Sequence, residues 1–252
     1  MSEETITSPQ NEKLKLLRRL AERRGREREG LFATEGEDLL SAGRAAGSEP
    51  ELVLVAAGSG LEGTAVDPEL LASASTLGSG TRAIALWPLP ADPGAEADAE
   101  LWVYLHGVAD PGNVGAIIRS AAGLADSLVV LGPGCADPYG PKATRASMGA
   151  LFAAPPLRAG VDRTPSPRLA LDAHRGEDLD VALAAGRPRT ICLGGERHGL
   201  TPEVLARCEG RATIPLRPPS ESGVESLNVA ASAAIALHRV CSAAASEDAT
   251  DA

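Results

Sequence analysis

The pattern of apolar and polar residues changes near residue 100, and this change predicts two domains. Before it, Leu14, Leu17 and Leu20 recur at helical spacing and predict an amphipathic helix with a basic face, for which Ser8 and Pro9 read as the cap and the first helical position. Short apolar runs follow and predict a small α/β domain. Its further elements are a helix at Glu37–Ala45 and strands at Leu52–Ala57 and Ala83–Leu86.

From Trp102 onward the pattern repeats in the order strand, polar loop, helix, which predicts a mostly parallel sheet covered on both faces. The expected strands are Trp102–Leu105, Leu128–Leu131, Leu169–Leu171, Thr190–Leu193 and Ala212–Ile214. The expected helices are Gly115–Ala125, Leu179–Ala185, Pro202–Arg207 and a long, Ala-rich helix from Leu227 to about Ala244.

The stretch between the two patterns is rich in Pro, Ala and acidic residues and has no apolar periodicity, so it reads as a linker. We therefore expect a first domain in residues 1–90, a linker in 91–100, a second domain in 101–245 and a frayed acidic tail in 246–252. No apolar run approaches the roughly 20 residues that span a bilayer, and the N-terminus is polar. These features predict a soluble cytoplasmic protein.

The net charge is −10, from 24 Lys and Arg against 34 Asp and Glu, which at first argues against a nucleic-acid partner. The deficit is local, however, because residues 33–100 alone carry a charge of −10. Between Lys13 and Arg28, eight basic residues stand against two acidic ones, as either a solvated helix face or a contact for phosphates. The four cysteines form no C-x-x-C pair, which favours reduced thiols and no metal site.

Polar turns follow three of the expected strand positions, where ligands bind to open parallel sheets. Asn113 reads as a helix cap with Arg119 on the second turn, and the loop Gly194-Gly195-Glu196-Arg197-His198-Gly199-Leu200 is rich in glycine. Ser226 and Asn228 open the last helix. Each turn alone has a purely structural explanation, and His198 in the loop, a candidate general base, reads more readily as a solvated side chain.

The order and spacing of these turns, together with Ile214-Pro215-Leu216 and Ser226-Leu227-Asn228-Val229, resemble the three motifs of the TrmH (SpoU) branch of the SPOUT RNA methyltransferases. The resemblance covers roughly residues 100–242. Residues Thr7-Ser8, Lys13-Leu14-Lys15 and Phe32-Ala33-Thr34-Glu35-Gly36 are also similar to the substrate-binding domain that precedes many of these enzymes.

The resemblance implies an α/β SPOUT-type parallel sheet with a C-terminal trefoil knot, preceded by a ribosomal-protein-like α/β domain. It implies a homodimer through the methyltransferase domain, with S-adenosylmethionine as cofactor and a ribose 2′-hydroxyl of structured RNA as acceptor. By the same resemblance, the catalytic residues are Asn113, Arg119, Glu196, Ser226 and Asn228. The cofactor-binding residues are Leu193, Gly194, Gly195, Gly199, Ile214, Leu216, Leu227 and Asn228. The RNA-binding residues are Lys13, Lys15, Arg18, Arg19 and Arg145, the last equally explained by a structural ion pair.

A guanidinium stays protonated in proteins, so Arg119 acts either as the family's general base or as a clamp for phosphate and alkoxide charge. The separate first domain favours ribosomal RNA, with guanosine as a candidate nucleotide, over transfer RNA. A non-catalytic RNA-binding descendant is the alternative from another class. A nucleotide-dependent oxidoreductase is disfavoured, because no G-x-G-x-x-G follows Leu52–Ala57 or Trp102–Leu105.

Overall fold

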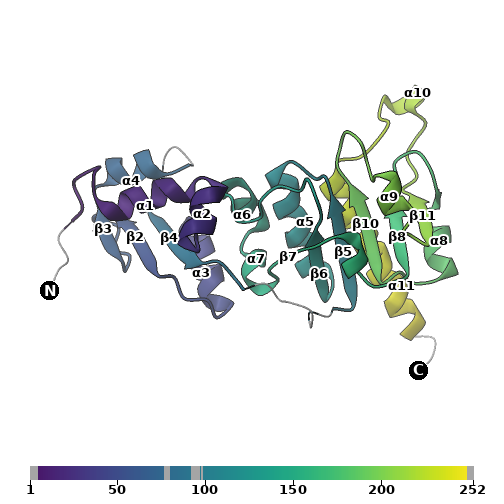
Figure 1. Cartoon of the computed structure of the whole chain (residues 1–252), viewed down its shortest axis with the longest axis horizontal. Helices are drawn as coiled ribbons and strands as arrows, with labels where there is room; N and C mark the ends of the chain where they lie inside the picture. The colour runs from purple at the N-terminus through teal and green to yellow at the C-terminus, as the bar shows by residue number, and fades with distance from the viewer. Residues whose placement is uncertain (1–4, 77–79, 92–96, 98, 249–252) are drawn as a thin grey trace. The chain divides into compact units, whose positions relative to one another are not determined.

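The computed structural model describes residues 5–76, 80–91, 97 and 99–248. It divides into two compact units, each considered by itself below (Figure 1). The first unit contains Met1–Ala91 and Asp137–Ala153, and the second contains Asp92–Ala136 and Ala154–Ala252. The division near residue 91 falls at the start of the expected linker, most of which lies outside the described residues. Residues 137–153, expected in the second domain, group instead with the first unit.

The first unit is a four-stranded sheet with helices packed against it (Figure 1). The strand order is β1-β4-β2-β3, in which β4 pairs antiparallel with both β1 and β2, and β3 pairs parallel with β2. The strands are β1 Leu31–Glu35, β2 Leu52–Ala56, β3 Thr64–Val66 and β4 Ala83–Pro88. The helices are α1 Glu12–Leu20, α2 Arg23–Glu29, α3 Glu37–Ala45, α4 Pro68–Ala74, α6 Pro141–Ser147 and α7 Ala150–Ala153.

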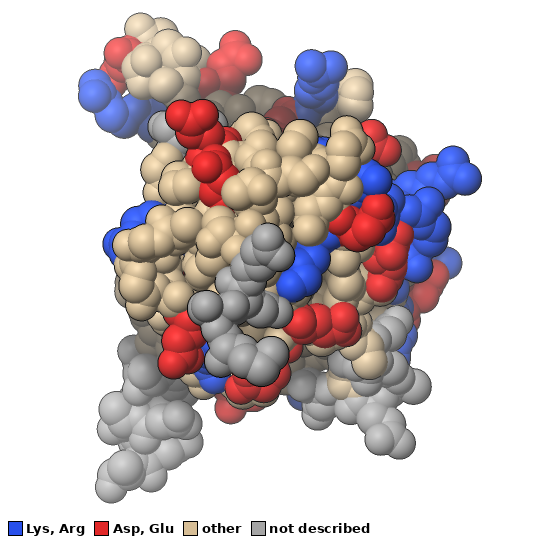
Figure 2. Space-filling model, turned by 90° about the vertical axis from the view of Figure 1, so that its left-hand side faces the viewer, with Lys and Arg blue, Asp and Glu red and all other residues tan. Residues whose placement is uncertain are grey.

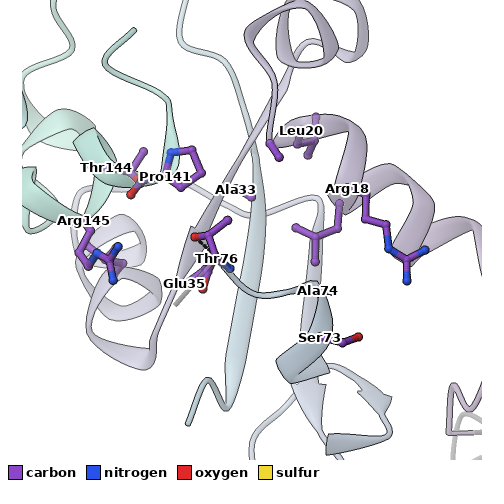
Figure 3. A pocket seen from close by; sticks show the side chains of 13 residues that line it. Arg18, Leu20, Ala33, Glu35, Ser73, Ala74, Thr76, Pro141, Thr144 and Arg145 are labelled. Atoms are coloured by element: carbon purple, nitrogen blue, oxygen red, sulfur yellow. Dashed lines mark hydrogen bonds between the residues drawn. The ribbon is translucent and has the colours of Figure 1, made fainter. Parts of the chain in front are cut away.

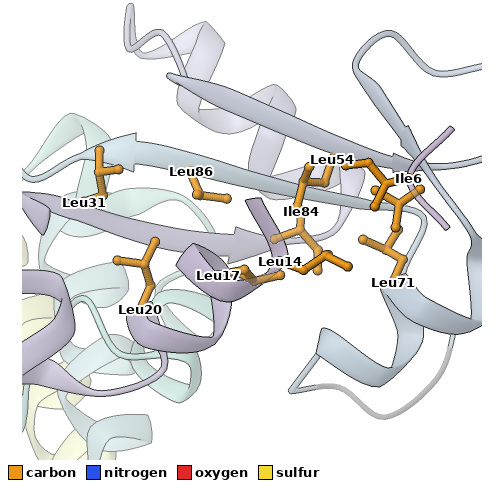
Figure 4. Packing of buried hydrophobic residues seen from close by; sticks show 10 residues of the cluster. Ile6, Leu14, Leu17, Leu20, Leu31, Leu54, Leu71, Ile84 and Leu86 are labelled. Atoms are coloured by element: carbon orange, nitrogen blue, oxygen red, sulfur yellow. The ribbon is translucent and has the colours of Figure 1, made fainter. Parts of the chain in front are cut away.

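Helix α1 buries the predicted apolar stripe, since Leu14, Leu17 and Leu20 are all at most 5% exposed and belong to one core cluster with sheet residues (Figure 4). The predicted start at Ser8 and Pro9 is wrong. Asn11 is the N-cap, and its side chain accepts a hydrogen bond from the backbone N–H of Lys13, while Ser8 belongs to a turn before the helix.

The prediction of one continuous basic helix through Arg28 is also wrong, because the helix is interrupted between α1 and α2. Arg26 of α2 is buried, and its Nη1 donates to the carbonyl oxygens of Leu20 and Ala21 at 2.6 and 2.9 Å, at the end of α1. The same guanidinium pairs with Asp137 at 2.5 Å. Arg26 therefore fixes the junction of α1 and α2 and attaches it to the segment that begins at Asp137.

Aromatic side chains also join residues 137–153 to the first unit. The ring of Phe32 on β1 lies 5.1 Å from Tyr139 and 5.7 Å from Phe152, measured between centroids. Trp87 on β4 contacts Phe152 edge to face at 4.7 Å, and its Nε1 donates to Thr34. With two Trp, two Tyr and two Phe in the chain, this cluster uses a large share of its aromatic residues.

The second unit is a seven-stranded sheet in which every pair is parallel, as expected, with the order β7-β6-β5-β10-β8-β11-β9. The strands are β5 Leu101–His106, β6 Ser127–Leu131, β7 Leu157–Arg158, β8 Arg168–Leu171, β9 Glu177–Asp178, β10 Thr190–Gly194 and β11 Gly210–Thr213. The helices are α5 Pro111–Leu124, η1 Val161–Arg163, α8 Leu179–Ala185, α9 Pro202–Leu205, α10 Pro219–Ser222 and α11 Val229–Asp248.

Helix α11 continues three residues into the expected tail, whose last residues, 249–252, lie outside the described part of the chain. Parallel pairing agrees with the expected SPOUT-type sheet, and the trefoil knot stays a prediction. Among the described helices, none combines the length and the apolar character needed to cross a membrane.

Candidate active site

Three side chains from the three polar turns form one hydrogen-bonded chain in the second unit. Asn113, in the first turn of α5, donates through Nδ2 to Oε1 of Glu196, in the loop after β10. Its Oδ1 accepts from Nδ2 of Asn228, at the start of α11, at 3.1 Å. The fold thus joins residues that lie 83 and 115 positions apart in the sequence.

Asn113 is not the helix cap that the sequence suggested, whereas Asn228, expected with Ser226 to open the last helix, does cap it. Asp110 caps α5, and its Oδ1 accepts from the backbone N–H of Asn113 at 3.0 Å. Asn228 caps α11 through Oδ1, which accepts from the backbone N–H groups of Ala230 and Ala231 at 2.8 and 3.3 Å. The side chain of Asn113 is therefore free of capping and bridges the two other turns.

A cavity of about 580 Å³ lies beside these three hydrogen-bonded residues, and its volume is within the size range of cofactor sites. Its walls come from the loops after β8 and β10 and from the segment between β11 and α11. Glu196 and Ser226, two of the expected catalytic residues, also line it. The eight expected cofactor-binding residues all line it: Leu193, Gly194, Gly195, Gly199, Ile214, Leu216, Leu227 and Asn228.

The loop after β10 requires glycine because side chains there would collide with the protein's own backbone. A Cβ on Gly194 would lie 2.0 Å from the carbonyl carbon of Gly199, and one on Gly195 would lie 2.1 Å from the carbonyl oxygen of Gly107. Gly199 has a φ of +62° and donates its N–H to the carbonyl of Gly195 at 2.9 Å, which closes a narrow hairpin. The glycines thus shape the cavity wall by letting two loops pack backbone to backbone.

The loop after β8 also lines the cavity, although sequence reasoning missed it. Asp172 accepts at Oδ1 from the backbone N–H groups of His174 and Arg175, at 2.9 and 3.1 Å, and its other oxygen lies 3.8 Å from Arg211. The signal was available, because these residues directly follow the predicted strand Leu169–Leu171. They place a histidine and an arginine on the cavity wall.

Arg119 lies apart from the cavity of its own chain. Asn113 and Arg119 are six residues apart on α5, which turns them about 120° away from each other around the helix axis. Arg119 is exposed, and no hydrogen bond or ion pair joins it to another residue in the part of the chain that the structure describes. Within one chain, Asn113 and Glu196 therefore lie together, whereas Arg119 does not join them.

Titratable groups beneath the site are structural. Burial raises the pKa of Tyr104 to about 12, and its hydroxyl lies 3.3 Å from Nδ1 of His106 at the end of β5. Cys192 is fully buried on β10, and its pKa is raised, most of all by a hydrogen bond with Cys208 and next by burial. All four cysteines are free, and in the described residues no three His, Cys, Asp or Glu side chains gather as a metal site requires.

Comparison with known proteins identifies the region that carries these motifs. Residues 100–238 match the SpoU rRNA Methylase family, and residues 11–79 match the MRM3-like substrate binding domain. The chain belongs to the SpoU rRNA methylase family. The resemblance drawn from the sequence motifs is thereby confirmed.

Among the relatives of this SpoU-family chain is an uncharacterised tRNA/rRNA methyltransferase of Mycobacterium tuberculosis, 36% identical over 60% of this chain and 55% of the relative. The 23S rRNA (guanosine(2553)-2′-O)-methyltransferase RlmP of Bacillus subtilis is 31% identical over 57% of this chain and 59% of RlmP. The SpoU-family chain thus spans little more than half the length of these curated relatives.

Solved structures resemble the SpoU-family chain over almost its whole length. The crystal structure of an RNA 2′-O ribose methyltransferase aligns with a TM-score of 0.80 and 28% identity, covering 96% of this chain and 100% of that one. AviRb from Streptomyces viridochromogenes, crystallised with AdoMet, aligns with a TM-score of 0.81 at 24% identity, covering 94% and 99%. The second likeness concerns the fold alone.

The expected RNA-binding residues of the SpoU-family chain differ in whether their charged groups already contact other side chains of the protein. Lys15 and Arg19 pair with Glu12 and Glu29 at 2.8 and 3.0 Å, and Lys13 donates to Thr64. Figure 2, which looks onto the first unit, shows basic side chains interleaved with acidic ones. The remaining two expected residues, Arg18 and Arg145, are exposed and line a common cavity of the first unit.

Proposed function

We propose that this chain transfers a methyl group from S-adenosylmethionine to the ribose 2′-hydroxyl of a guanosine in ribosomal RNA. The observation that carries the proposal is the cavity beside the Asn113, Glu196 and Asn228 chain, because the residues expected to hold the cofactor line it together. The names of RlmP and of the aligned 2′-O ribose methyltransferase support ribose in ribosomal RNA as the acceptor.

The cavity fits S-adenosylmethionine in size and in character. Gly194 and Gly195 leave backbone at the wall, while Ile214, Leu216 and Leu227 supply apolar surface for a ring and a methionine chain. The bound cofactor supplies an activated methyl group on a sulfonium. What the protein must add is alignment of the acceptor oxygen and stabilisation of the charge that develops on it.

The hydrogen-bonded chain is suited to hold the acceptor ribose. Glu196 accepts from Asn113 at Oε1, so Oε2 remains to accept a hydrogen bond from the 2′-hydroxyl. Asn113 is in turn held by Asn228, which fixes its amide orientation. This arrangement orients the hydroxyl, whose proton leaves to Oε2 of Glu196 or to water as the oxygen–methyl bond forms and the sulfur–methyl bond breaks.

We assign Arg119 to the site of a second copy of the chain. Arg119 is exposed on α5 and is not among the residues that line the cavity of its own chain, whereas the family resemblance implies a catalytic role for it. Leu124 on α5 and Ile235 on α11 are 40% and 38% exposed, and these two helices pack against each other. Exposed apolar side chains on two helices that pack together support dimerisation through this part of the second unit.

Two measurements test the proposed function. Isothermal titration with S-adenosylmethionine should give saturable binding, whereas a non-catalytic RNA-binding descendant need not bind it. The purified chain should then transfer tritiated methyl groups to unmodified ribosomal RNA and not to transfer RNA. After nuclease digestion the label should lie in a ribose-methylated guanosine dinucleotide, and label on a base would contradict the proposal.

Arg119→Lys and Arg119→Ala should each lose methyl transfer, because a lysine cannot make the bidentate contacts of a guanidinium. Arg187→Ala is the matched control, since Arg187 is an exposed arginine before the amino end of β10, the end away from the cavity. Mixed subunits carrying Arg119→Ala and Glu196→Ala should regain activity if Arg119 acts across the dimer. Full activity of Arg119→Ala would refute its role.

A further inference from the structure

A second cavity, of about 200 Å³, lies within the first unit. Leu17 and Leu20 of α1 and Leu39 of α3 are among its lining residues, and each is at most 5% exposed. Further wall comes from β1, from the end of α4 and from α6. This hollow opens to the surface and has both apolar and polar lining, so it is available to a ligand.

The size of this cavity limits the ligand to one ring system. An apolar cavity of about 150 Å³ accepts benzene, whereas drug-sized ligands occupy about 300–1,000 Å³. A whole nucleotide or the cofactor is therefore too large to be enclosed. A single nucleobase, flat and with two apolar faces, is of a size that fits this cavity.

Two arginines stand at the mouth of the cavity. Arg18 and Arg145 are both exposed, and Figure 3 shows them on opposite sides of Glu35 and Thr76. Nη1 of Arg18 donates to the carbonyl of Pro9 at 2.8 Å, whereas no hydrogen bond or ion pair joins the guanidinium of Arg145 to another described residue. Two guanidinium groups on opposite sides of the cavity match the phosphates on either side of a nucleobase.

The polar edge of the cavity is the carboxylate of Glu35. Oε1 accepts from the backbone N–H and the hydroxyl of Thr76 at 2.8 and 2.6 Å, and Oε2 accepts from the hydroxyl of Ser75 at 2.5 Å. A carboxylate has about four acceptor positions, so one remains. A base with an exocyclic amine satisfies that position, whereas the uracil O4 carbonyl repels it.

We propose that this cavity binds one unpaired, amine-bearing nucleobase of the RNA, with the flanking phosphates on Arg18 and Arg145. The proposal rests on the proposed function, and it specifies that the substrate presents a single-stranded loop or bulge to the first unit. Arg18 and Glu35 lie in the segment matched to the substrate binding domain, and Arg145 lies in the segment matched to the methylase. Neither matched segment alone forms the site.

Binding of short fluorescent oligocytidine and oligouridine of equal length to the full chain tests the proposal. These probes differ at position 4 of the base, an amine in cytosine and a carbonyl in uracil, and at N3, which accepts a hydrogen bond in cytosine and donates one in uracil. We expect tighter binding of oligocytidine by about tenfold, the size of one good hydrogen-bonded base contact. In Glu35→Gln, which keeps the size of the side chain, this preference should shrink.

A variant that fills the cavity with a larger side chain tests whether a nucleobase binds there. Ala74→Leu places a larger side chain in the cavity wall, and Ala72→Leu makes the same change on α4 outside the wall. Ala74→Leu should weaken oligocytidine binding about tenfold, because the larger side chain takes up space that the base would occupy, and Ala72→Leu should not. Thermal unfolding of both variants establishes that they fold.

The salt dependence of oligonucleotide binding tests the proposed phosphate contacts of the two arginines. Arg145→Gln and Arg18→Gln should each lower the slope of log affinity against log salt by about 0.7, the value for one phosphate of a single strand. Arg44→Gln, an exposed arginine outside the cavity, should leave the slope unchanged. Equal binding of both probes, or an unchanged affinity in Ala74→Leu, overturns the proposal, as does absence of oligocytidine binding at millimolar concentration.

Methyl transfer distinguishes the two proposals. If the wild-type chain methylates ribosomal RNA and Ala74→Leu neither weakens oligocytidine binding nor lowers kcat/KM, the nucleobase cavity is refuted and the proposed function stands. If the wild-type chain binds no S-adenosylmethionine while Ala74→Leu weakens oligocytidine binding, the proposed function is refuted and the cavity stands.

Discussion

Replacing Asn228 with aspartate separates the two roles of this side chain. Its Oδ1 caps α11, and its Nδ2 donates to Asn113 at 3.1 Å. Aspartate caps a helix as well as asparagine does, but it has no N–H to donate. Asn228→Asp should therefore keep the cap and lose the hydrogen bond that orients Asn113.

The expected magnitudes follow from these contacts. Loss of the hydrogen bond costs about 1 kcal/mol of transition-state stabilisation, which corresponds to a roughly fivefold lower kcat/KM for methyl transfer. The free energy of unfolding should stay within about 0.5 kcal/mol of wild type. In Asn228→Ala, which lacks both groups, stability should also fall by about 1 kcal/mol.

Urea unfolding and tritiated methyl transfer, measured on the same preparations, check both values. Asn113→Ala combined with Asn228→Asp should be no slower than Asn113→Ala alone, because both variants break one chain of contacts. Wild-type kcat/KM in Asn228→Asp would refute the orienting role. Equal stability losses in the aspartate and alanine variants would refute the assignment of the cap.

Three further outcomes are expected. Gly194→Ala should weaken S-adenosylmethionine binding at least about tenfold in calorimetry, because its Cβ would strike the hairpin backbone, whereas Gly123→Ala, in open space, should not. Arg26→Met should lower the free energy of unfolding by about 3 kcal/mol in urea, and adding Asp137→Asn should recover part of that loss. A backbone N–H lowers the pKa of Glu209, so its stabilisation is present at neutral pH and is lost as the pH falls through its folded pKa. Glu209→Gln should therefore lower the urea midpoint at neutral pH and change it little in acid.

Strand positions in the second unit were predictable because each central strand is a short apolar run between polar turns. The structure places β5, β6, β8, β10 and β11 within two residues of the predicted starts. Strands β7 and β9 have two residues each, too few for any pattern, and pair at the sheet edges. Helix α5 starts earlier than predicted, at Pro111, because Asp110 is its cap.

Long-range contacts explain what the sequence could not reveal about the first unit. The break after α1 depends on Arg26 and Asp137, which are 111 residues apart and carry no local signal. Residues 137–153 join this unit through Tyr139 and Phe152, which contact Phe32. Pattern reasoning treated the segment as part of the second domain because it lies between two of that domain's strands.

The candidate site was predictable where its residues directly follow strands and carry a recognisable motif, as in the loop that contains Glu196. The hydrogen-bonded chain through Asn113 was not, because a cap and a bridge use the same residue types in the same place. Asp172 escaped notice because a short polar turn after a strand is common. Its role emerges only from the fold of the loop onto the cavity.

Mapping ribose 2′-O-methylation across total RNA from a strain that lacks the gene and from its parent tests directly whether this protein methylates ribosomal RNA. One guanosine of ribosomal RNA should lose its methyl group in the deletion strain. Restoring the intact gene should return the methyl group, and restoring the Arg119→Ala variant should not. An identical methylation map in both strains would contradict the account.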